Sequence, residues 1–162
     1  MITQVISRRY AQALFLSTRE KGLIDLAYEQ FNDLNNLLVA DASLMNFLKA
    51  PQVLEESKIS LIRDVFKEHL DILFFEFIVV LIEKGRIGYL SNIIKEFNYL
   101  VETEKGIGRV TVLTARKISE SQREALTAKL VKKTGLKIFL EEKVDPSIIG
   151  GMIVKMYDQI ID

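Results

Sequence analysis

The chain has 162 residues, enough for one ordinary domain or for a helical domain with a small second part. Cysteine is absent and His69 is the single histidine, so disulfides and thiolate metal sites are excluded, and most zinc and Ser-His-Asp sites are disfavoured. The 22 basic residues equal the 22 acidic ones, so no overall field recruits nucleic acid or lipid.

Apolar residues recur at helical spacing through the first two thirds of the chain. In the first segment Ile2, Ile6, Tyr10 and Leu14 stand four residues apart, and Gly22 follows where glycine readily adopts the left-handed conformation that ends a helix. Five further segments show the same period. The six helices are expected over about 2–21, 23–39, 41–48, 54–66, 70–84 and 89–104.

The fifth of these segments is apolar nearly all round. Its run ILFFEFIVVLI, from Ile72 to Ile82, contains Glu76 and is about half as long as the roughly 20 residues of a membrane span. It is therefore predicted to be a buried helix. Because a six-helix bundle seldom covers every side of one member, apolar area left exposed here would mark a docking groove. The pattern alone leaves both interpretations open.

The spacing of the apolar residues changes after Gly108, from a helical to an alternating pattern. Val110 and Val112 alternate as in a strand, Ser119 and Gln122 form a capping box that begins a helix, and two more strands are expected over about 137–141 and 152–156. Charge shifts at the same place: 12 basic and 15 acidic residues precede Gly106, whereas 10 basic and 7 acidic residues follow. The predicted fold is mostly α with a small α+β part: an N-terminal six-helix bundle, residues 1–105, followed by a β-α-β-β unit, residues 106–162.

Few residues suggest chemistry. Gly150 and Gly151 precede a strand and no GK[ST] or GxGxxG motif follows, so they are predicted to form a structural bend or close backbone approach and not a phosphate cradle. His69 lies between charged residues at a helix joint and is predicted to be a capping or surface residue. The neighbouring carboxylates of 55–56 and 141–142 point in different directions and are interpreted as solvated.

A basic stretch in the second part leaves an alternative open. Acidic Glu120 and Glu124 interrupt it, and Phe139 is the one aromatic residue nearby, so a solvated or partner-facing surface is favoured over a nucleic-acid site. An RNA- or ribosome-associated adaptor therefore remains as the second hypothesis. A small enzyme without a cofactor is a third, although no set of acid, base and nucleophile supports it. The basic residues are Arg116, Lys117, Arg123, Lys129, Lys132, Lys133 and Lys137.

Four segments carry a resemblance to a known family. They are RRYAQALF at 8–15, FLKAPQV at 47–53, EKGRI at 83–87 and, most specific, VDPSIIGGMIVKMYDQIID at 144–162. Over essentially its whole length the chain resembles the delta subunit of the rotary proton-translocating ATP synthase, the oligomycin-sensitivity-conferring protein of mitochondria. Tyr157 departs from the family, which usually has a small residue there, so a different local turn or a different neighbouring surface is expected. The family commonly continues past Asp162, so a trimmed or unusually short chain is expected.

The resemblance implies a stator without catalytic residues, cofactors or metal. In the family, the N-terminal bundle binds N-terminal helices of the alpha subunits of the catalytic head, and the C-terminal part binds the b subunits of the peripheral stalk. The head then does not turn with the rotor. Membrane association would be indirect, through the complex, and no nucleic acid is expected. Since no secretory signal or transit peptide is evident, the expected location is the cytoplasmic face of a bacterial membrane.

The resemblance also implies a binding groove between the first and fifth helices. Carried over to matching positions, its residues are Tyr10 and Leu14 from the first helix and Phe77 and Val80 from the fifth. Binding a partner helix in such a groove agrees with the surplus of apolar residues in the fifth helix.

Overall fold

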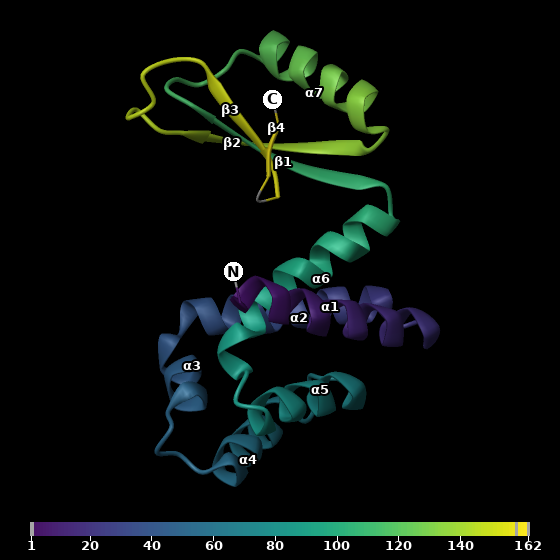
Figure 1. Cartoon of the computed structure of the whole chain (residues 1–162), viewed down its shortest axis with the longest axis vertical. Coiled ribbons are helices and arrows are strands. Elements are labelled where there is room, and N and C mark those ends of the chain that lie inside the picture. The colour runs from purple at the N-terminus through teal and green to yellow at the C-terminus, as the bar shows by residue number, and fades with distance from the viewer. Residues whose placement is uncertain (1, 158, 162) are drawn as a thin grey trace. The chain divides into compact units, whose positions relative to one another are not determined.

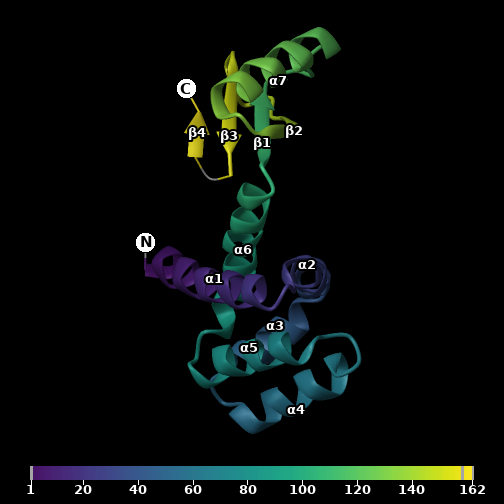
Figure 2. The same cartoon turned by 90° about the vertical axis from the view of Figure 1, so that its right-hand side faces the viewer.

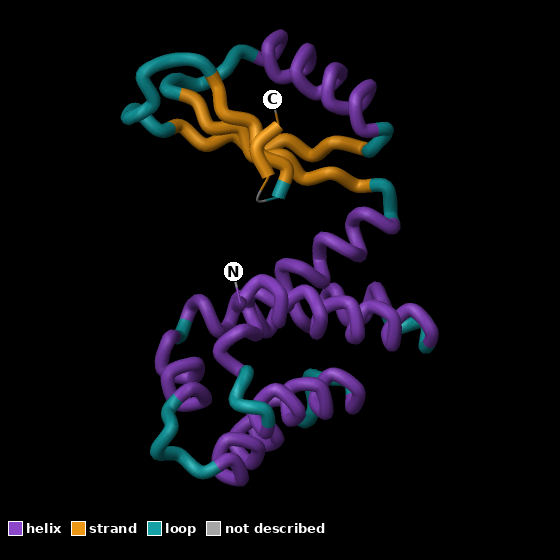
Figure 3. The backbone as a smooth tube through the Cα atoms, in the orientation of Figure 1, coloured by secondary structure: helices purple, strands orange, loops and turns teal. Residues whose placement is uncertain are grey.

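The computed structural model describes residues 2–157 and 159–161 and divides into two compact units, Met1–Val101 and Glu102–Asp162 (Figure 1). The division falls inside the last helix of the bundle, close to the boundary expected after Lys105. Helices make up the first unit, whereas the strands are confined to the second (Figure 3). The predicted fold class is confirmed. That each part has its own binding role stays a prediction.

All six predicted helices of the first unit are present (Figure 2). Asp41 begins the third by accepting a hydrogen bond from the Ser43 N–H at 2.9 Å. The Ser43 hydroxyl, which donates to the same carboxylate at 2.6 Å, is the main cause of the lowered pKa of Asp41, and the bond from the N–H adds to it. A 3-10 turn, Ile87–Tyr89, precedes the sixth helix. The helices are α1 (Ile2–Glu20), α2 (Ile24–Ala40), α3 (Ala42–Lys49), α4 (Glu55–Phe66), α5 (Ile72–Glu83) and α6 (Leu90–Glu104).

Aromatic side chains fill the centre of the bundle. Three fully buried rings meet there: Phe31 of α2, Phe74 of α5 and Phe97 of α6. The centroid of the Phe31 ring lies 5.2 Å from that of Phe74 and 6.1 Å from that of Phe97. Each such ring removes a large apolar area from water, which holds three helices together. The predicted burial of the 72–82 helix is confirmed for Phe74, Ile78, Leu81 and Ile82, whereas four of its other residues are half-buried and three are exposed.

The second unit is a four-stranded sheet covered on one face by a helix (Figure 1). Strands β1 (Ile107–Thr114) and β2 (Lys137–Val144) are parallel because α7 (Glu120–Thr134) crosses between them. Strand β3 (Met152–Met156) pairs antiparallel with β1, and β4 (Gln159–Ile161) with β3, giving the order β2-β1-β3-β4. The sequence pattern does not predict β4, which is too short for its period to be recognised. The small core contains Val110, Val112, Leu130 and Val154.

The glycine pair before β3 forms the predicted bend. Gly151 has φ +76°, in the left-handed region that favours glycine, whereas Gly150 is not among the positive-φ residues. A side chain at either position would meet no atom within 4 Å, so close backbone approach plays no part here. Glycine is therefore favoured at position 151 by the left-handed backbone conformation, and not by a lack of space for a side chain.

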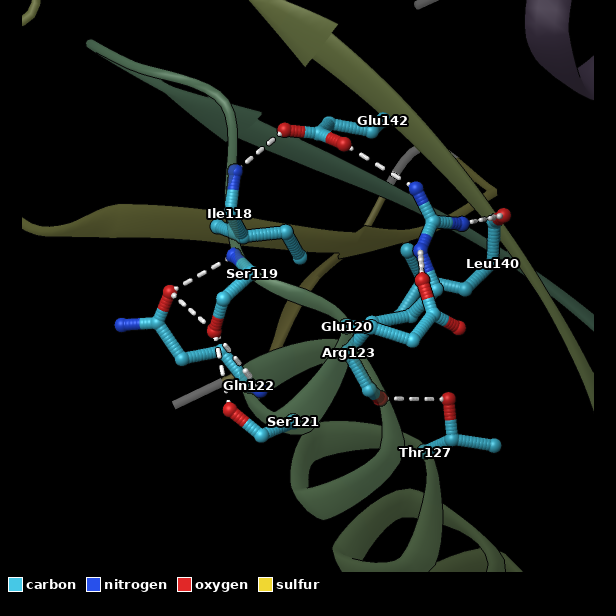
Figure 4. Close-up of polar contacts among 9 residues, drawn as sticks. All are labelled: Ile118, Ser119, Glu120, Ser121, Gln122, Arg123, Thr127, Leu140 and Glu142. Carbon is cyan, nitrogen blue, oxygen red and sulfur yellow. Dashed lines mark hydrogen bonds and ion pairs between the residues drawn. The ribbon is translucent and has the colours of Figure 1, made fainter.

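The interpretation of Glu142 as a solvated residue is wrong. Its side chain is 7% exposed, and Figure 4 shows it accepting a hydrogen bond from the Ile118 N–H at 2.7 Å and forming an ion pair with Arg123 at 3.0 Å. Glu141 points to the opposite face and is 66% exposed, as alternation in a strand requires. Glu142 therefore joins β2 to the start of α7, where Ser119 and Gln122 form the predicted capping box.

Alanine at Gly151 tests the bend. We expect Gly151→Ala to lower the free energy of unfolding by about 1 kcal/mol because a side chain disfavours the left-handed region. The matched control is Gly150→Ala, for which the unfolding free energy should change by less than about 0.5 kcal/mol. Urea denaturation measures both. Equal effects of the two substitutions would contradict this explanation.

Alanine at Glu142 tests the buried ion pair. We expect Glu142→Ala to destabilise the protein by about 2 kcal/mol, since it leaves the Ile118 N–H without its acceptor and removes the shorter of the two ion pairs of Arg123. Glu141→Ala, one residue away on the exposed face, should stay within about 0.5 kcal/mol of the parent. If thermal and urea denaturation gave the same loss for both, the role assigned to Glu142 would be wrong.

Candidate partner-binding surface

An aromatic chain leads from the surface between α1 and α5 into the core. The ring of Tyr10, on α1, meets Phe77, on α5, edge to face with centroids 6.2 Å apart and planes inclined by 72°. Phe77 in turn meets the fully buried Phe31 at 5.9 Å and 82°. Tyr10 and Phe77 are half-buried. Because edge-to-face contacts fix ring orientation, these two predicted residues form a preorganised surface.

Arg86 completes this arrangement, although the sequence pattern places it only within the EKGRI segment and does not assign it to the site. Its Nη1 donates to the Tyr10 hydroxyl at 2.7 Å, and its guanidinium carbon lies 5.5 Å from the centre of that ring. Gly85, with φ +63°, ends α5, and the Arg86 N–H donates back to the Leu81 carbonyl at 2.7 Å. This helix end brings Arg86 to Tyr10.

The other two predicted residues differ in exposure. Leu14, one turn along α1 from Tyr10, is only 3% exposed and belongs to the core. Val80, one turn along α5 from Phe77, is 40% exposed. The structure therefore brings Tyr10, Phe77 and Val80 to the surface and places Leu14 beneath it. Such a surface can accept apolar side chains of another molecule but offers no acid-base pair. The binding role of the four residues stays a prediction.

The remaining candidates do not form a second site of the predicted kinds. His69 is exposed at the joint after α4, as expected for a surface residue. Arg123 of the basic stretch is engaged by Glu142, and Lys137 lies 5.4 Å from the Phe139 ring centre. Within residues 2–157 and 159–161, no cluster of three His, Asp or Glu side chains is placed to hold a metal ion. No helix in the same ranges has the length and apolar character needed to cross a membrane.

Known proteins match this chain over nearly its whole length. Residues 6–162 match the protein family described as ATP synthase delta (OSCP) subunit. The chain is 30% identical over 159 residues to the ATP synthase subunit delta of Clostridium kluyveri, covering 98% of this chain and 88% of that protein. It is 31% identical to its counterpart in Geotalea uraniireducens, covering 100% and 91%.

A solved structure shares the fold. One protein in the cryo-EM structure of the Toxoplasma gondii mitochondrial ATP synthase hexamer superposes with a TM-score of 0.78 at 19% sequence identity. The match covers 96% of the present chain and 88% of that one. The arrangement of helices and strands is thus shared despite low sequence identity.

Proposed function

This chain belongs to the ATP synthase delta (OSCP) subunit family and is a peripheral-stalk subunit of that complex, and we propose that it acts there as a non-catalytic clamp. In this proposal the first unit binds an N-terminal helix of an alpha subunit of the catalytic head. The second unit binds the b subunits of the stalk. The observation that supports the clamp is apolar Val80, 40% exposed beside the Tyr10–Phe77 contact.

The proposed clamp works by apolar burial. An amphipathic helix lying between α1 and α5 would cover Val80 and the exposed parts of Tyr10 and Phe77. A standard interface buries about 800 Å² on each partner and can hold at nanomolar strength, about −12 kcal/mol. A stator needs slow dissociation, and buried aromatic and aliphatic anchors provide it better than exposed charges do.

The two proposed contacts together would resist the torque of the rotor. With one unit on the head and the other on the stalk, the head is kept from turning, so rotor torque changes the conformation of the catalytic sites. The relatives from Clostridium and Geotalea are bacterial, which supports a position at the cytoplasmic face of a bacterial membrane. Attachment to the membrane would be indirect, through the stalk. The family match gives no support to the RNA-adaptor alternative.

Titration with a peptide from the N-terminus of the alpha subunit tests the first contact. We expect Val80→Asp to weaken binding by about tenfold to hundredfold, because the interface would bury an unpaired charge. Isothermal titration calorimetry gives the affinity, and circular dichroism checks that the helices remain. Val39→Asp, at a 74% exposed position on α2, is the matched control and should bind like the parent. Equal affinity of the two variants would refute the assignment.

A fragment of residues 1–105 tests the separation of roles. It retains the buried core of the bundle and should fold cooperatively, with the helical circular dichroism signal of six helices. We expect it to bind the alpha peptide as the full chain does but to lose binding to a peptide from the C-terminal end of the stalk's b subunits, measured by the same titration. An unfolded fragment, or one that still bound the stalk peptide, would contradict the two-part proposal.

A further inference from the structure

A second apolar groove lies on the bundle, lined by residues other than those of the α1–α5 surface. It has a volume of about 440 Å³ and is formed by α2, the C-terminal end of α4 and the joint that follows. Its floor contains the buried Leu34 and Phe66, while Leu37 and Val65 are 55% and 46% exposed along it. Gln30, Asp33, His69 and Leu70 complete the lining. None of Tyr10, Phe77, Val80 or Arg86 takes part.

Polar contacts fix the shape of this groove. The Gln30 side chain accepts a hydrogen bond at 2.9 Å from the N–H of Asp71, and Asp71 in turn caps α5 by accepting from the Leu73 N–H at 2.9 Å. The groove wall on α2 is thereby tied to the start of α5. A groove formed before binding costs less ordering entropy when a partner docks.

The charge along α2 indicates what kind of partner would lie there. Leu37, Asp33 and Glu29 are spaced by four residues, so they form one stripe along the helix. Leu37 and Asp33 line the groove, and Glu29 and Asp33 both reach solvent. His69, from the joint after α4, also lines the groove, and Lys67, two residues earlier in the chain, is exposed but is not part of the lining. The α2 wall therefore offers an apolar anchor followed by two carboxylates on successive turns.

We propose that this groove binds a second partner helix, one that is amphipathic and basic. A helix lying along α2 would place a large apolar residue between Leu37 and Val65, and lysine or arginine one and two turns away, opposite Asp33 and Glu29. Both helices rise about 5.4 Å per turn, so a four-residue spacing on one matches the same spacing on the other. The proposal goes beyond the α1–α5 contact and does not require it.

Two synthetic peptides test this with the full-length chain. The first is helical and carries leucine at one end of a single face and lysine on the following turns; the second has glutamate in place of each lysine. We expect only the lysine peptide to bind, and to shift the amide NMR signals of Leu37 and Val65. Val65→Asp should weaken binding of the lysine peptide about tenfold. Asp33→Lys should weaken binding of the lysine peptide about threefold and improve binding of the glutamate peptide. Leu37→Asp provides a second groove variant should Val65→Asp disturb folding.

Two controls separate this groove from the other surface. Val39→Asp on α2 and Val80→Asp on α5 should leave binding of the lysine peptide unchanged. If Val80→Asp weakened it and Val65→Asp did not, the peptide would occupy the α1–α5 surface, which overturns the second groove but leaves the clamp intact. Absence of binding, or equal binding of both peptides, would also overturn the proposal. Failure of the alpha peptide to bind would bear on the clamp alone.

Discussion

The need to cover α5 determines the form of the first unit. Nearly every residue of this helix is apolar, so burying one stripe is not enough and neighbours must pack on several sides. Phe74, Ile78 and Leu81 are fully buried against the rest of the bundle. Val80 remains 40% exposed, and Ile72, at the start of the helix, 68%. The bundle thus buries four residues of α5 and partly covers four others, but leaves apolar area uncovered.

Contacts between aromatic rings keep the side chains next to this uncovered apolar area in fixed orientations. The half-buried Tyr10 and Phe77 and the fully buried Phe31 are linked by successive edge-to-face contacts, and Arg86 holds the Tyr10 end of the series. A side chain fixed in this way loses little conformational freedom when a partner covers it, so more of the burial free energy is available for binding. This rigidity suits a static clamp better than a flexible surface would.

Local patterns predict what depends on neighbours in sequence. The six helices, the capping box at Ser119 and the turn at Gly151 each depend on residues a few positions apart, and all are confirmed. What the sequence does not reveal depends on distant partners. Glu142 is buried because Arg123 lies opposite it, and the α2–α4 groove exists because side chains far apart in sequence leave space between them. The role of Arg86 likewise requires knowing that α5 ends beside Tyr10.

Tyr157 shows how a distant contact can maintain an unfavourable turn. Of the residues that the structure describes, it is the one non-glycine with positive φ, +55°, a conformation that costs a side chain about 1–2 kcal/mol. Its hydroxyl donates to the carboxylate of Glu102 at 3.1 Å, and Glu102, only 3% exposed, also pairs with Arg109. A hydrogen bond to a charged group contributes about 1.5–3 kcal/mol, enough to offset the strain.

Glycine at this position would relieve the strain but would also remove the hydroxyl that donates to Glu102. The turn at Tyr157 is therefore coupled to a buried carboxylate 55 residues earlier in the chain. The same side chain also reaches the Ile107 carbonyl, at 3.4 Å, at the beginning of β1. In this protein, polar contacts from Tyr157 to Glu102 and Ile107, at the start of the second unit, thus stabilise its left-handed backbone conformation. Glycine at position 157 would adopt that conformation without such contacts, because it has no Cβ.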